Sequence, residues 1–405
     1  MTCTTQIRLR HVVRNTVAKS TGEPESFIGL EDIAGGAGRL VAQGVAEKAA
    51  TDALAFEPGD VLVGKLRPYL AKSLAPTDRG TCTSELLVMR PGPRLDARFL
   101  LYLTLSEPWL DWAVTTSYGT KMPRTSWDAM ADFAFTLPPL GEQRRIADFL
   151  DTETARLDSM VEVKRHLADL TRERFRSVAS ASLFGDSDGA ATVDSGIPTI
   201  GPIPADWRTV RNKDLFREVA DLTTTGTEEL LSVSHLTGVT PRSEKNVTMF
   251  MAESLEGYKR VVRGDLVVNT MWAWMGALGV SHDEGIVSPA YGVYRSRSGG
   301  VYPPYFDLVY RSPEYVCEMT RHSKGVWTSR LRLYPEAFLA LRVPLPPLAV
   351  QVRVADVCHR ERERSERIVR SVERSLDVLD ERRQALITAA VTGQLDVTTA
   401  RGGHS

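Results

Sequence analysis

Two long stretches of the chain place apolar residues at intervals of three, four and seven positions among dense charge, which is the pattern of an amphipathic helix. Each stretch follows an LPPL motif, at 137–140 and 345–348, and each ends shortly before a glycine. A diproline cannot lie inside a helix but suits the residues just before one, and glycine is common where a helix ends. The pattern therefore predicts helices of about 142–184 and 350–392.

Each predicted helix has one apolar stripe, close to a heptad repeat, that requires a partner. The predicted seam consists of Ile146, Leu150, Leu157, Met160 and Leu167 in the first helix, followed by Leu170, and of Ile368, Val372, Leu376, Leu379 and Leu386 in the second. At 1.5 Å per residue, each helix would span roughly 60 Å. We expect a pseudo-twofold axis to relate the two copies, so that the equivalent helices pair antiparallel. The product would be a coiled-coil rod with one globular domain at each end. The alternative is that each helix folds back onto its own domain.

The remaining sequence shows short apolar runs bounded by Gly, Pro and Asp, which is typical of strands. Examples are FIGLEDI (27–33), VLVGKL (61–66) and SELLVMR (84–90). Residues 97–114 instead have helical spacing, and Pro108 suits the start of a second short helix. This mixture predicts a domain that contains both strands and helices.

The whole pattern occurs twice. LPPLGEQRRIAD (137–148) corresponds to LPPLAVQVRVAD (345–356), and Gln351 lies 208 positions after Gln143 (351 − 143). Four further segments correspond in the same order: FIGLEDIAGGAG (27–38) with LLSVSHLTGV (230–239), PGDVLVGKLRPYLAK (58–72) with RGDLVVNTMWAWMGA (263–277), CTSELLVMR (82–90) with VSPAYGVYR (287–295), and SVASASLFG (177–185) with LITAAVTG (386–393). A period this long indicates a duplicated domain and helix, because solenoid repeats are only about 20–50 residues long.

The duplication predicts an α+β protein with two homologous mixed α/β domains, joined by two long antiparallel coiled-coil helices in a pseudo-twofold repeat. The expected parts are a first domain at 1–137, a first long helix at 138–185, a linker and second domain at 186–345, a second long helix at 346–393, and a flexible tail at 394–405.

Composition and cysteine spacing favour a globular protein and oppose a membrane-spanning, secreted or disulfide-linked one. The 405 residues carry a net charge of −1, and 42% of them are hydrophobic, which is usual for a globular protein. We expect a cytoplasmic protein, because the sequence has no apolar run of about 18 residues and no signal-peptide core at its start. The cysteines lie far apart without a Cys-x-x-Cys pair, which opposes a zinc site or a disulfide framework; they are Cys3, Cys82, Cys317 and Cys358.

No motif for catalysis stands out. The sequence lacks a P-loop, a strand-linked Gly-x-Gly-x-x-Gly, the Asn/Asp-Pro-Pro-aromatic tetrad of amino-methyltransferases, His-Glu-x-x-His and Gly-x-Ser-x-Gly. The glycine-rich IAGGAGRL (33–40) is interpreted as a turn, and His235 and His282 fit scattered surface histidines better than metal ligands. We therefore expect no catalytic, cofactor-binding or metal-ligating residues in this chain.

Basic residues interleaved with aromatic ones follow short strands in each repeat, which suits contacts with DNA phosphates and base edges. The candidates are Lys65, Arg67, Tyr69, Lys72, Lys121 and Arg124 in the first repeat, and Asn269, Trp272, Trp274, Arg330 and Arg332 in the second. A common framework with different side chains at matching places is what two domains that recognise different sequences would show. The alternative is structural: Trp272 and Trp274 would lie in the core, and Arg67 would cap a strand or pair with Glu85.

The LPPL segments and the charged helices after them, with FIGLEDIAGGAGRLV, GDVLVGKLRPYLAK, DSGIPTIGPIPADW and NTMWAWMGALGVS, resemble the specificity subunit of type I restriction–modification enzymes. The resemblance implies that each globular repeat is a target recognition domain for one half of a bipartite site in double-stranded DNA. It implies that the long helices set the spacer between the halves and dock two modification subunits, and that restriction subunits can join. S-adenosylmethionine for adenine-N6 methylation, ATP and Mg would belong to those partners, with no cofactor in this chain.

One departure from the family concerns the start of the second long helix. A glutamate is usual there, and the first repeat has Gly141-Glu142-Gln143, whereas the second has Ala349-Val350-Gln351. This difference bears on the symmetry of the two partner-docking surfaces. Two other functions are considered: a non-catalytic cytoplasmic coiled-coil adaptor that binds proteins through its end domains, and a stand-alone methyltransferase or nuclease, which the missing motifs disfavour.

Overall fold

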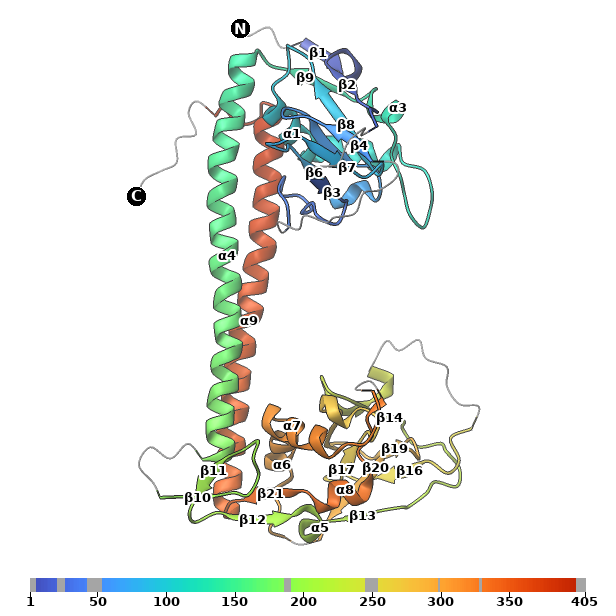
Figure 1. Ribbon diagram of the computed structural model, residues 1–405, viewed down its shortest axis with the longest axis vertical. Helices are drawn as coiled ribbons and strands as arrows, with labels where there is room; N and C mark the ends of the chain where they lie inside the picture. The colour runs from blue at the N-terminus through green and yellow to red at the C-terminus, as the bar shows by residue number, and fades with distance from the viewer. Residues whose placement is uncertain are drawn as a thin grey trace. The chain divides into compact units, whose positions relative to one another are not determined.

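The computed structural model describes residues 5–19, 26–41, 53–185, 191–244, 254–297, 299–327 and 330–397. The chain divides into two compact units (Figure 1). Unit 1 comprises Met1–Leu167 and Ser371–Ser405, and unit 2 comprises Ala168–Arg370. Parts of three sequence predictions lie outside the described residues: the linker at 186–190, the tail from 398 onward, and Cys3.

The described part of unit 1 contains a four-stranded antiparallel sheet, a three-stranded sheet, a two-stranded sheet and short α- and 3-10 helices. Its elements before the long helix are β1 (Thr5–Arg8), η1 (Leu9–His11), β2 (Val13–Asn15), β3 (Phe27–Ile28), β4 (Leu54–Phe56), β5 (Val61–Gly64), η2 (Pro68–Leu70), β6 (Ser73–Leu74), β7 (Gly80–Cys82), β8 (Leu86–Pro91), α1 (Ala97–Leu105), α2 (Glu107–Thr115), α3 (Trp127–Met130) and β9 (Ala134–Leu137). The larger sheet has the order β2-β8-β5-β6, the smaller one β3-β7-β4, and β1 pairs with β9. Pro108 lies in the first turn of α2, as predicted.

The core of unit 1 forms where α1 and α2 cover the larger sheet. Strand β5 is buried along its whole length, which explains its continuous apolar sequence VLVG. Trp109 of α2 lies edge-on to Phe133, with ring centroids 5.1 Å apart. Helix α1 is buried around most of its circumference, and Phe99, Leu100 and Leu103 belong to the core of unit 1.

Unit 2 repeats this arrangement. Its elements are β10 (Thr192–Asp194), β11 (Pro202–Pro204), β12 (Arg208–Arg211), α5 (Asn212–Leu215), β13 (Phe216–Glu218), β14 (Leu231–Ser234), β15 (Gly238–Pro241), η3 (Arg242–Glu244), β16 (Lys259–Val261), β17 (Leu266–Val268), η4 (Ala273–Met275), β18 (Leu278–Val280), β19 (Gly285–Val287), β20 (Gly292–Ser296), α6 (Pro303–Tyr310), α7 (Pro313–His322), α8 (Pro335–Ala340) and β21 (Arg342–Leu345). The sheet β13-β20-β17-β18 corresponds to β2-β8-β5-β6, and β12 pairs with β21 as β1 does with β9.

A buried ion pair recurs at the same place in both sheets. Asp60 accepts two hydrogen bonds from Arg90, at 2.7 and 2.8 Å, and Asp265 accepts two from Arg295, both at 2.8 Å. Each aspartate follows a glycine with positive φ and also accepts a backbone N–H three residues upstream. Both carboxylates are almost fully buried, so each needs these partners. The repeat seen in the sequence is therefore a repeat of structure.

Two helices of 45 and 44 residues, α4 (Leu140–Phe184) and α9 (Leu348–Val391), follow the two diprolines. Each ends just before a glycine with a φ of +77°. A buried glutamine near the start of each long helix forms hydrogen bonds with the domain that precedes the helix in the sequence. Gln143 accepts the Asp96 N–H at 2.8 Å, and its amide donates to two backbone carbonyls. Gln351 does the same with the Tyr302 N–H at 2.9 Å and two carbonyls.

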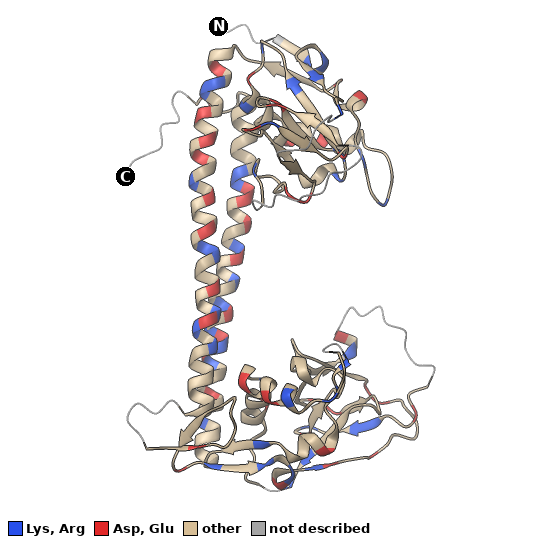
Figure 2. Ribbon diagram, viewed as in Figure 1, with Lys and Arg blue, Asp and Glu red and all other residues tan. Residues whose placement is uncertain are grey.

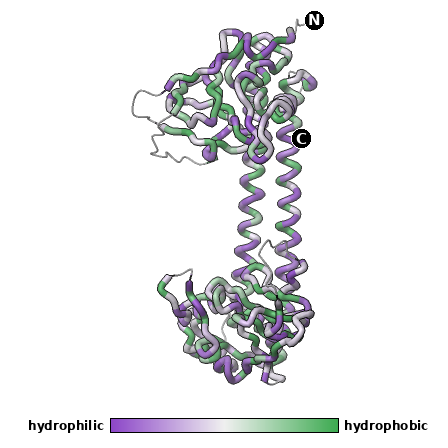
Figure 3. The backbone as a smooth tube through the Cα atoms, turned by 90° about the vertical axis from the view of Figure 1, so that its right-hand side faces the viewer, coloured by the Kyte–Doolittle hydropathy of each residue, from purple (hydrophilic) through white to green (hydrophobic). Residues whose placement is uncertain are grey.

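The long helices pack together within each unit, in opposite directions. In unit 1, Leu157 and Val161 of α4 form a cluster with Leu379 of α9. In unit 2, the Arg362 guanidinium lies 5.8 Å from the centre of the Phe175 ring, and Ser365 donates to the Thr171 carbonyl. In both units, rising residue numbers in α4 meet falling numbers in α9, so the pairing is antiparallel as predicted. Figure 3 shows the alternation of hydrophilic and hydrophobic residues along both helices.

The alternative that each helix packs on its own domain also describes part of the structure. Ile146 and Leu150 of α4 join the core of unit 1, with Ile387 of α9 and, partly buried, Leu386. In unit 2, Leu183 and Cys358 join the equivalent core. In each unit both long helices contribute to the globular core, so each helix divides its apolar residues between the core at either end and the other helix.

Three predicted seam residues are corrected by the structure. Met160 and Leu167 are 50% and 48% exposed, and Ile368 is 36% exposed. The buried residues are instead Val161 and Ala168, one position further along α4. One residue turns a helix by about 100°, so the larger side chains next to the seam face away from it. Of the other predicted members, Val372 and Leu379 are buried and Leu376 is packed against the seam cluster.

Candidate nucleic-acid interface

A short turn follows the central strand in each unit. In unit 1, η2 lies between Arg67 and Ala71, which both have a φ of +49°. In unit 2, η4 follows Trp272 and is closed by Gly276, with a φ of +84°. A left-handed conformation costs an L-residue about 1–2 kcal/mol, and glycine far less. Arg67 is thus held in a strained conformation at the position that Trp272 occupies in unit 2.

A hairpin packs beside this turn in each unit. In unit 1, Tyr118 and Arg124 exchange two backbone hydrogen bonds of 2.9 Å, and the Thr125 N–H donates to the Lys65 carbonyl at 2.9 Å. In unit 2, Lys324 and Arg332 exchange two bonds of 2.9 Å, and the Leu333 N–H donates to the Thr270 carbonyl at 2.9 Å. We call residues 65–72 with 117–125, and residues 270–277 with 323–327 and 330–333, the turn–hairpin surface of each unit.

Three basic candidates of unit 1 are held by the protein itself. The Lys65 ammonium donates to the Ser84 carbonyl at 2.6 Å, and the Lys72 ammonium donates to the Leu30 carbonyl at 2.7 Å. Arg124 forms an ion pair with Glu85, which raises the pKa of the guanidinium. Burial lowers the pKa of Lys65, an effect that the nearby Glu85 carboxylate partly offsets.

The remaining candidates of unit 1 are Arg67, Tyr69 and Lys121, which are all exposed on the turn–hairpin surface. No acidic side chain in the described part of the chain pairs with Arg67 or Lys121. The expected alternative for Arg67, an ion pair with Glu85, is wrong because Arg124 takes that carboxylate. Arg67 instead donates its backbone N–H to the Pro123 carbonyl at 2.7 Å.

The candidates of unit 2 separate in the same way. Asn269 is buried, and its side chain accepts the Met271 N–H at 3.3 Å, so it shapes the turn and does not lie on the exposed surface. Trp274 is half-buried and donates its indole N–H to the Met271 carbonyl at 3.1 Å. Trp272, by contrast, is 50% exposed, and Arg330 and Arg332 are exposed.

Apolar side chains at the hairpins complete these surfaces. Tyr118 and Met122 are exposed in unit 1, and Val326 and Trp327 are exposed in unit 2, with Trp327 at 69%. Trp327 was missed by the candidate list. Its sequence context, KGVWTS, could have identified it, since tryptophan is enriched at binding interfaces and this segment has the glycine and polar residues of a surface loop.

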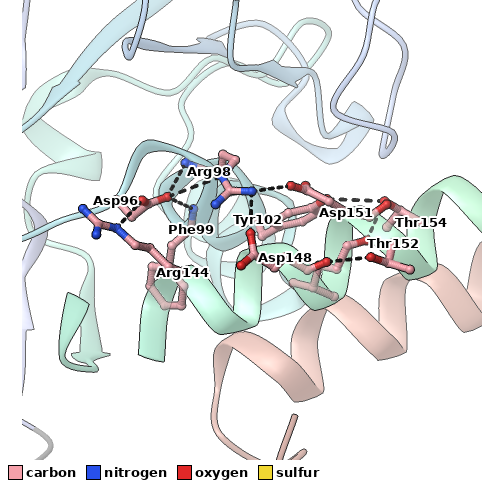
Figure 4. Close-up of polar contacts among 10 residues, drawn as sticks. Asp96, Arg98, Phe99, Tyr102, Arg144, Asp148, Asp151, Thr152 and Thr154 are labelled. Atoms are coloured by element: carbon pink, nitrogen blue, oxygen red, sulfur yellow. Dashed lines mark hydrogen bonds and ion pairs between the residues drawn. The ribbon is translucent and has the colours of Figure 1, made fainter. Parts of the chain in front are cut away.

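A second polar cluster joins the first domain to α4 (Figure 4). Arg98 forms ion pairs of 2.8 Å with both Asp148 and Asp151, and the Tyr102 hydroxyl donates to Asp151 at 2.6 Å. Burial and the Asp151 carboxylate raise the pKa of Tyr102. Every charged group here has a partner on the facing element, so the cluster fixes α1 on α4. Acidic and basic residues alternate along both long helices, as a solvated face requires (Figure 2).

Two further observations concern the described residues only. They contain no group of three or more His, Cys, Asp or Glu side chains placed to hold a metal ion. Within the same ranges, no helix combines the length and the apolar character needed to cross a membrane.

Comparison with known proteins connects this architecture to one family. Residues 77–165 match the model of the type I restriction modification DNA specificity domain. The specificity subunit of the type I restriction enzyme EcoDI from Escherichia coli is 29% identical over 91 residues, 22% of this chain. That match spans only 20% of the length of the E. coli protein.

Two solved structures share the fold over nearly the whole chain. One is a chain from work on complex assembly and conformational transition of the type I R-M system, with a TM-score of 0.73, 20% identity, and coverage of 97% of this chain and 98% of that chain. The other is the HsdS subunit from Thermoanaerobacter tengcongensis, with a TM-score of 0.53, 19% identity and 97% coverage of each chain. The two sequence matches confirm the family resemblance over part of the chain, and the two solved structures confirm the predicted fold class.

Proposed function

We propose that the chain is the DNA-recognising specificity subunit of a type I restriction–modification complex, and that each unit recognises one half of a bipartite site. The observation that carries the proposal is one scaffold used twice with different exposed side chains. The ion pairs Asp60–Arg90 and Asp265–Arg295 are equivalent, whereas the turn carries Arg67 in unit 1 and Trp272 in unit 2. Selection for two different base sequences accounts for this contrast better than selection for stability does.

The turn–hairpin surfaces have the chemistry that contact with duplex DNA needs. An arginine can donate two hydrogen bonds to a guanine edge, and an aromatic ring can contact a thymine methyl group or a sugar. Exposed basic side chains such as Lys121 and Arg330 suit phosphates, which carry no sequence information but position the protein. The near-zero net charge does not oppose this function, because a local basic patch is sufficient.

The long helices are proposed to dock two modification subunits, with restriction subunits joining the assembly. An exposed apolar stripe on α4 in unit 1 supports this proposal: Met160, Val163 and Leu167 are each about half exposed or more. Apolar residues three and four positions apart are the pattern with which a helix contacts another helix. The chain itself would be non-catalytic and cytoplasmic, and S-adenosylmethionine, ATP and Mg would be bound by the partner subunits.

The test is the salt dependence of binding between the full chain and a pool of duplex DNA. If about four phosphates are contacted, affinity falls roughly a hundredfold between 50 and 200 mM salt. Binding must also select one sequence from a pool with random positions. The adaptor function predicts no sequence selection and little salt dependence, so that result would overturn the proposal. Methylation of DNA by the chain without partners would instead support a stand-alone methyltransferase.

A further inference from the structure

Among the described residues, the arginine without an acidic partner lies on the turn in unit 1 and on the hairpin in unit 2. In unit 1 the hairpin arginine, Arg124, is paired with Glu85, while the turn arginine, Arg67, has no acidic partner in the described part of the chain. In unit 2 the equivalent of Arg67 is Trp272, so the turn carries no charge (272 − 67 = 205).

The hairpin of unit 2 also carries an arginine, but the position equivalent to Glu85 has no acidic residue. Ala290 lies 205 positions after Glu85 (290 − 85), which is the offset of the segments that contain them, and Arg332 corresponds to Arg124 because each exchanges two backbone hydrogen bonds across its hairpin. Ala290 is exposed, and Arg332 is exposed with no acidic partner among the residues that the structure describes. A small side chain thus replaces the carboxylate that would neutralise the guanidinium.

Hydrogen bonds of Lys65 and Thr270 relate these positions, through a backbone N–H in unit 1 and through a side-chain hydroxyl in unit 2. In unit 1, Lys65 donates its N–H to the Glu85 carbonyl at 2.9 Å and accepts the N–H of Thr125, which follows Arg124. In unit 2, Thr270 donates its hydroxyl to the Ala290 carbonyl at 2.9 Å and accepts the N–H of Leu333, which follows Arg332. Lys65 and Thr270 lie just after the central strand of their units, and each bonds both to the residue at position 85 or 290 and to the residue that follows the hairpin arginine. A glutamate at 290 would therefore face Arg332 as Glu85 faces Arg124.

We infer that the residue at position 85 or 290 determines which arginine of each unit contacts a DNA base edge. In unit 1, Arg124 is neutralised by its ion pair with Glu85 and does not contact a base, and Arg67 makes the contact from the turn. In unit 2, Ala290 leaves Arg332 available, and Arg332 makes the contact from the hairpin, beside Trp272. Guanine is the expected base at both contacts, because the two N–H groups of arginine match its O6 and N7 acceptors. This inference rests on the proposed function.

The backbone of Arg67 supports the assignment. Its left-handed conformation is unfavourable for any residue except glycine, yet an arginine stands there with its side chain exposed and without an acidic partner. The equivalent Trp272 has a φ of −127° and is not strained in this way. A requirement to hold the Arg67 side chain in one direction for DNA contact would account for this unfavourable backbone conformation.

The experiment compares Ala290→Glu with Ala290→Gln in the full chain. The two new side chains have nearly the same size, but only glutamate can neutralise Arg332. Bound duplexes are selected from a random pool and sequenced, and the affinity for the selected site is measured. Ala290→Glu should lower that affinity about 5- to 150-fold and relax base preference at one position of one half-site. Ala290→Gln should stay close to the original protein, and the other half-site should be unchanged in both.

Two more variants make the outcome decisive. Arg332→Ala should reproduce the loss seen with Ala290→Glu, and the double variant should lose little more than either alone, because both remove the same contact. Arg332→Ala also tests the inference if the glutamate variant does not fold. Equal behaviour of the Glu and Gln variants, or unchanged base preference in Arg332→Ala, would overturn the inference while leaving DNA recognition intact. Absence of sequence selection by the unaltered chain would overturn the proposed function itself.

Discussion

The scaffolds of unit 1 and unit 2 are nearly the same, and their exposed turns are not. Gln143 and Gln351 are buried with matching sets of partners, although the segments around them are only partly similar. At the turn, an arginine in a strained backbone in one unit corresponds to an unstrained tryptophan in the other. Positions that are constant support the fold, and positions that differ on the surface are those expected to distinguish one DNA sequence from another.

The strongest test of this comparison exchanges a whole domain. Replacing residues 1–136 with the equivalent domain of a relative should change one half of the methylated motif and leave the other half intact, because each unit has its own core. Methylome sequencing of cells that express the variant with its partner subunits would measure this. Changes in both halves, or in neither, would contradict independent recognition by the two units.

Removing the buried carboxylates should have a large effect on stability and the same effect in both units. Asp60→Ala and Asp265→Ala each delete a doubly hydrogen-bonded arginine contact and a backbone bond, so the free energy of unfolding should fall by about 3 kcal/mol in each. Urea denaturation followed by circular dichroism would measure the loss. Asp206→Ala, at an exposed aspartate, is the control and should change little. A large loss in only one unit would show that the scaffolds are not equivalent.

Substitutions at Arg67 should separate DNA affinity from stability. Arg67→Ala should cost about 1–3 kcal/mol of binding free energy without lowering the melting temperature. Arg67→Gly should cost the same affinity and raise stability by about 0.5–1 kcal/mol, because glycine favours the left-handed conformation. Fluorescence anisotropy and thermal denaturation would measure the two quantities. A loss of melting temperature without a loss of affinity would mean that Arg67 has a structural role.

The corresponding change on the hairpin should be weaker in unit 1. Arg124→Ala removes a guanidinium that Glu85 already neutralises, so its effect on DNA affinity should be about 0.5 kcal/mol. The same titration would measure it beside Arg67→Ala. An equal or larger loss at Arg124 would show that its ion pair opens when DNA binds.

The smallest stability effect is expected on the exposed side of α4. Met160→Gln should change the free energy of unfolding by less than about 0.5 kcal/mol, whereas Val161→Gln, one residue further along, should destabilise by about 1–3 kcal/mol because Val161 is buried. If modification subunits dock on the exposed stripe, Met160→Gln should nevertheless weaken their binding, which isothermal titration calorimetry would detect. Unchanged partner affinity would remove that stripe from the docking surface.

Sequence alone predicted the large features because each has a local signal. Diprolines and glycines mark both ends of the long helices, and the matching segments have a constant order. The seam was misplaced by one position because apolar residues stand side by side at 160–161 and 167–168, so spacing in the sequence does not decide which member of each pair faces the other helix.

The candidate site was predicted less completely, because the availability of an arginine depends on contacts between distant segments. Glu85 precedes β8 and Arg124 lies on a hairpin 39 residues later, so their ion pair cannot be inferred from either segment. The burial of Asn269 likewise depends on the turn that its own side chain stabilises.

The buried glutamines have a consequence for how such a gene can change. Gln143 and Gln351 bind the same kinds of backbone group in both units, so the joint between domain and helix does not depend on which domain is attached. A recombination event within the codons for either LPPL motif would keep this joint intact and deliver a foreign domain to an unaltered helix. If each domain recognises one half-site as proposed, a domain acquired in this way would bring its own DNA specificity without any change in the helix.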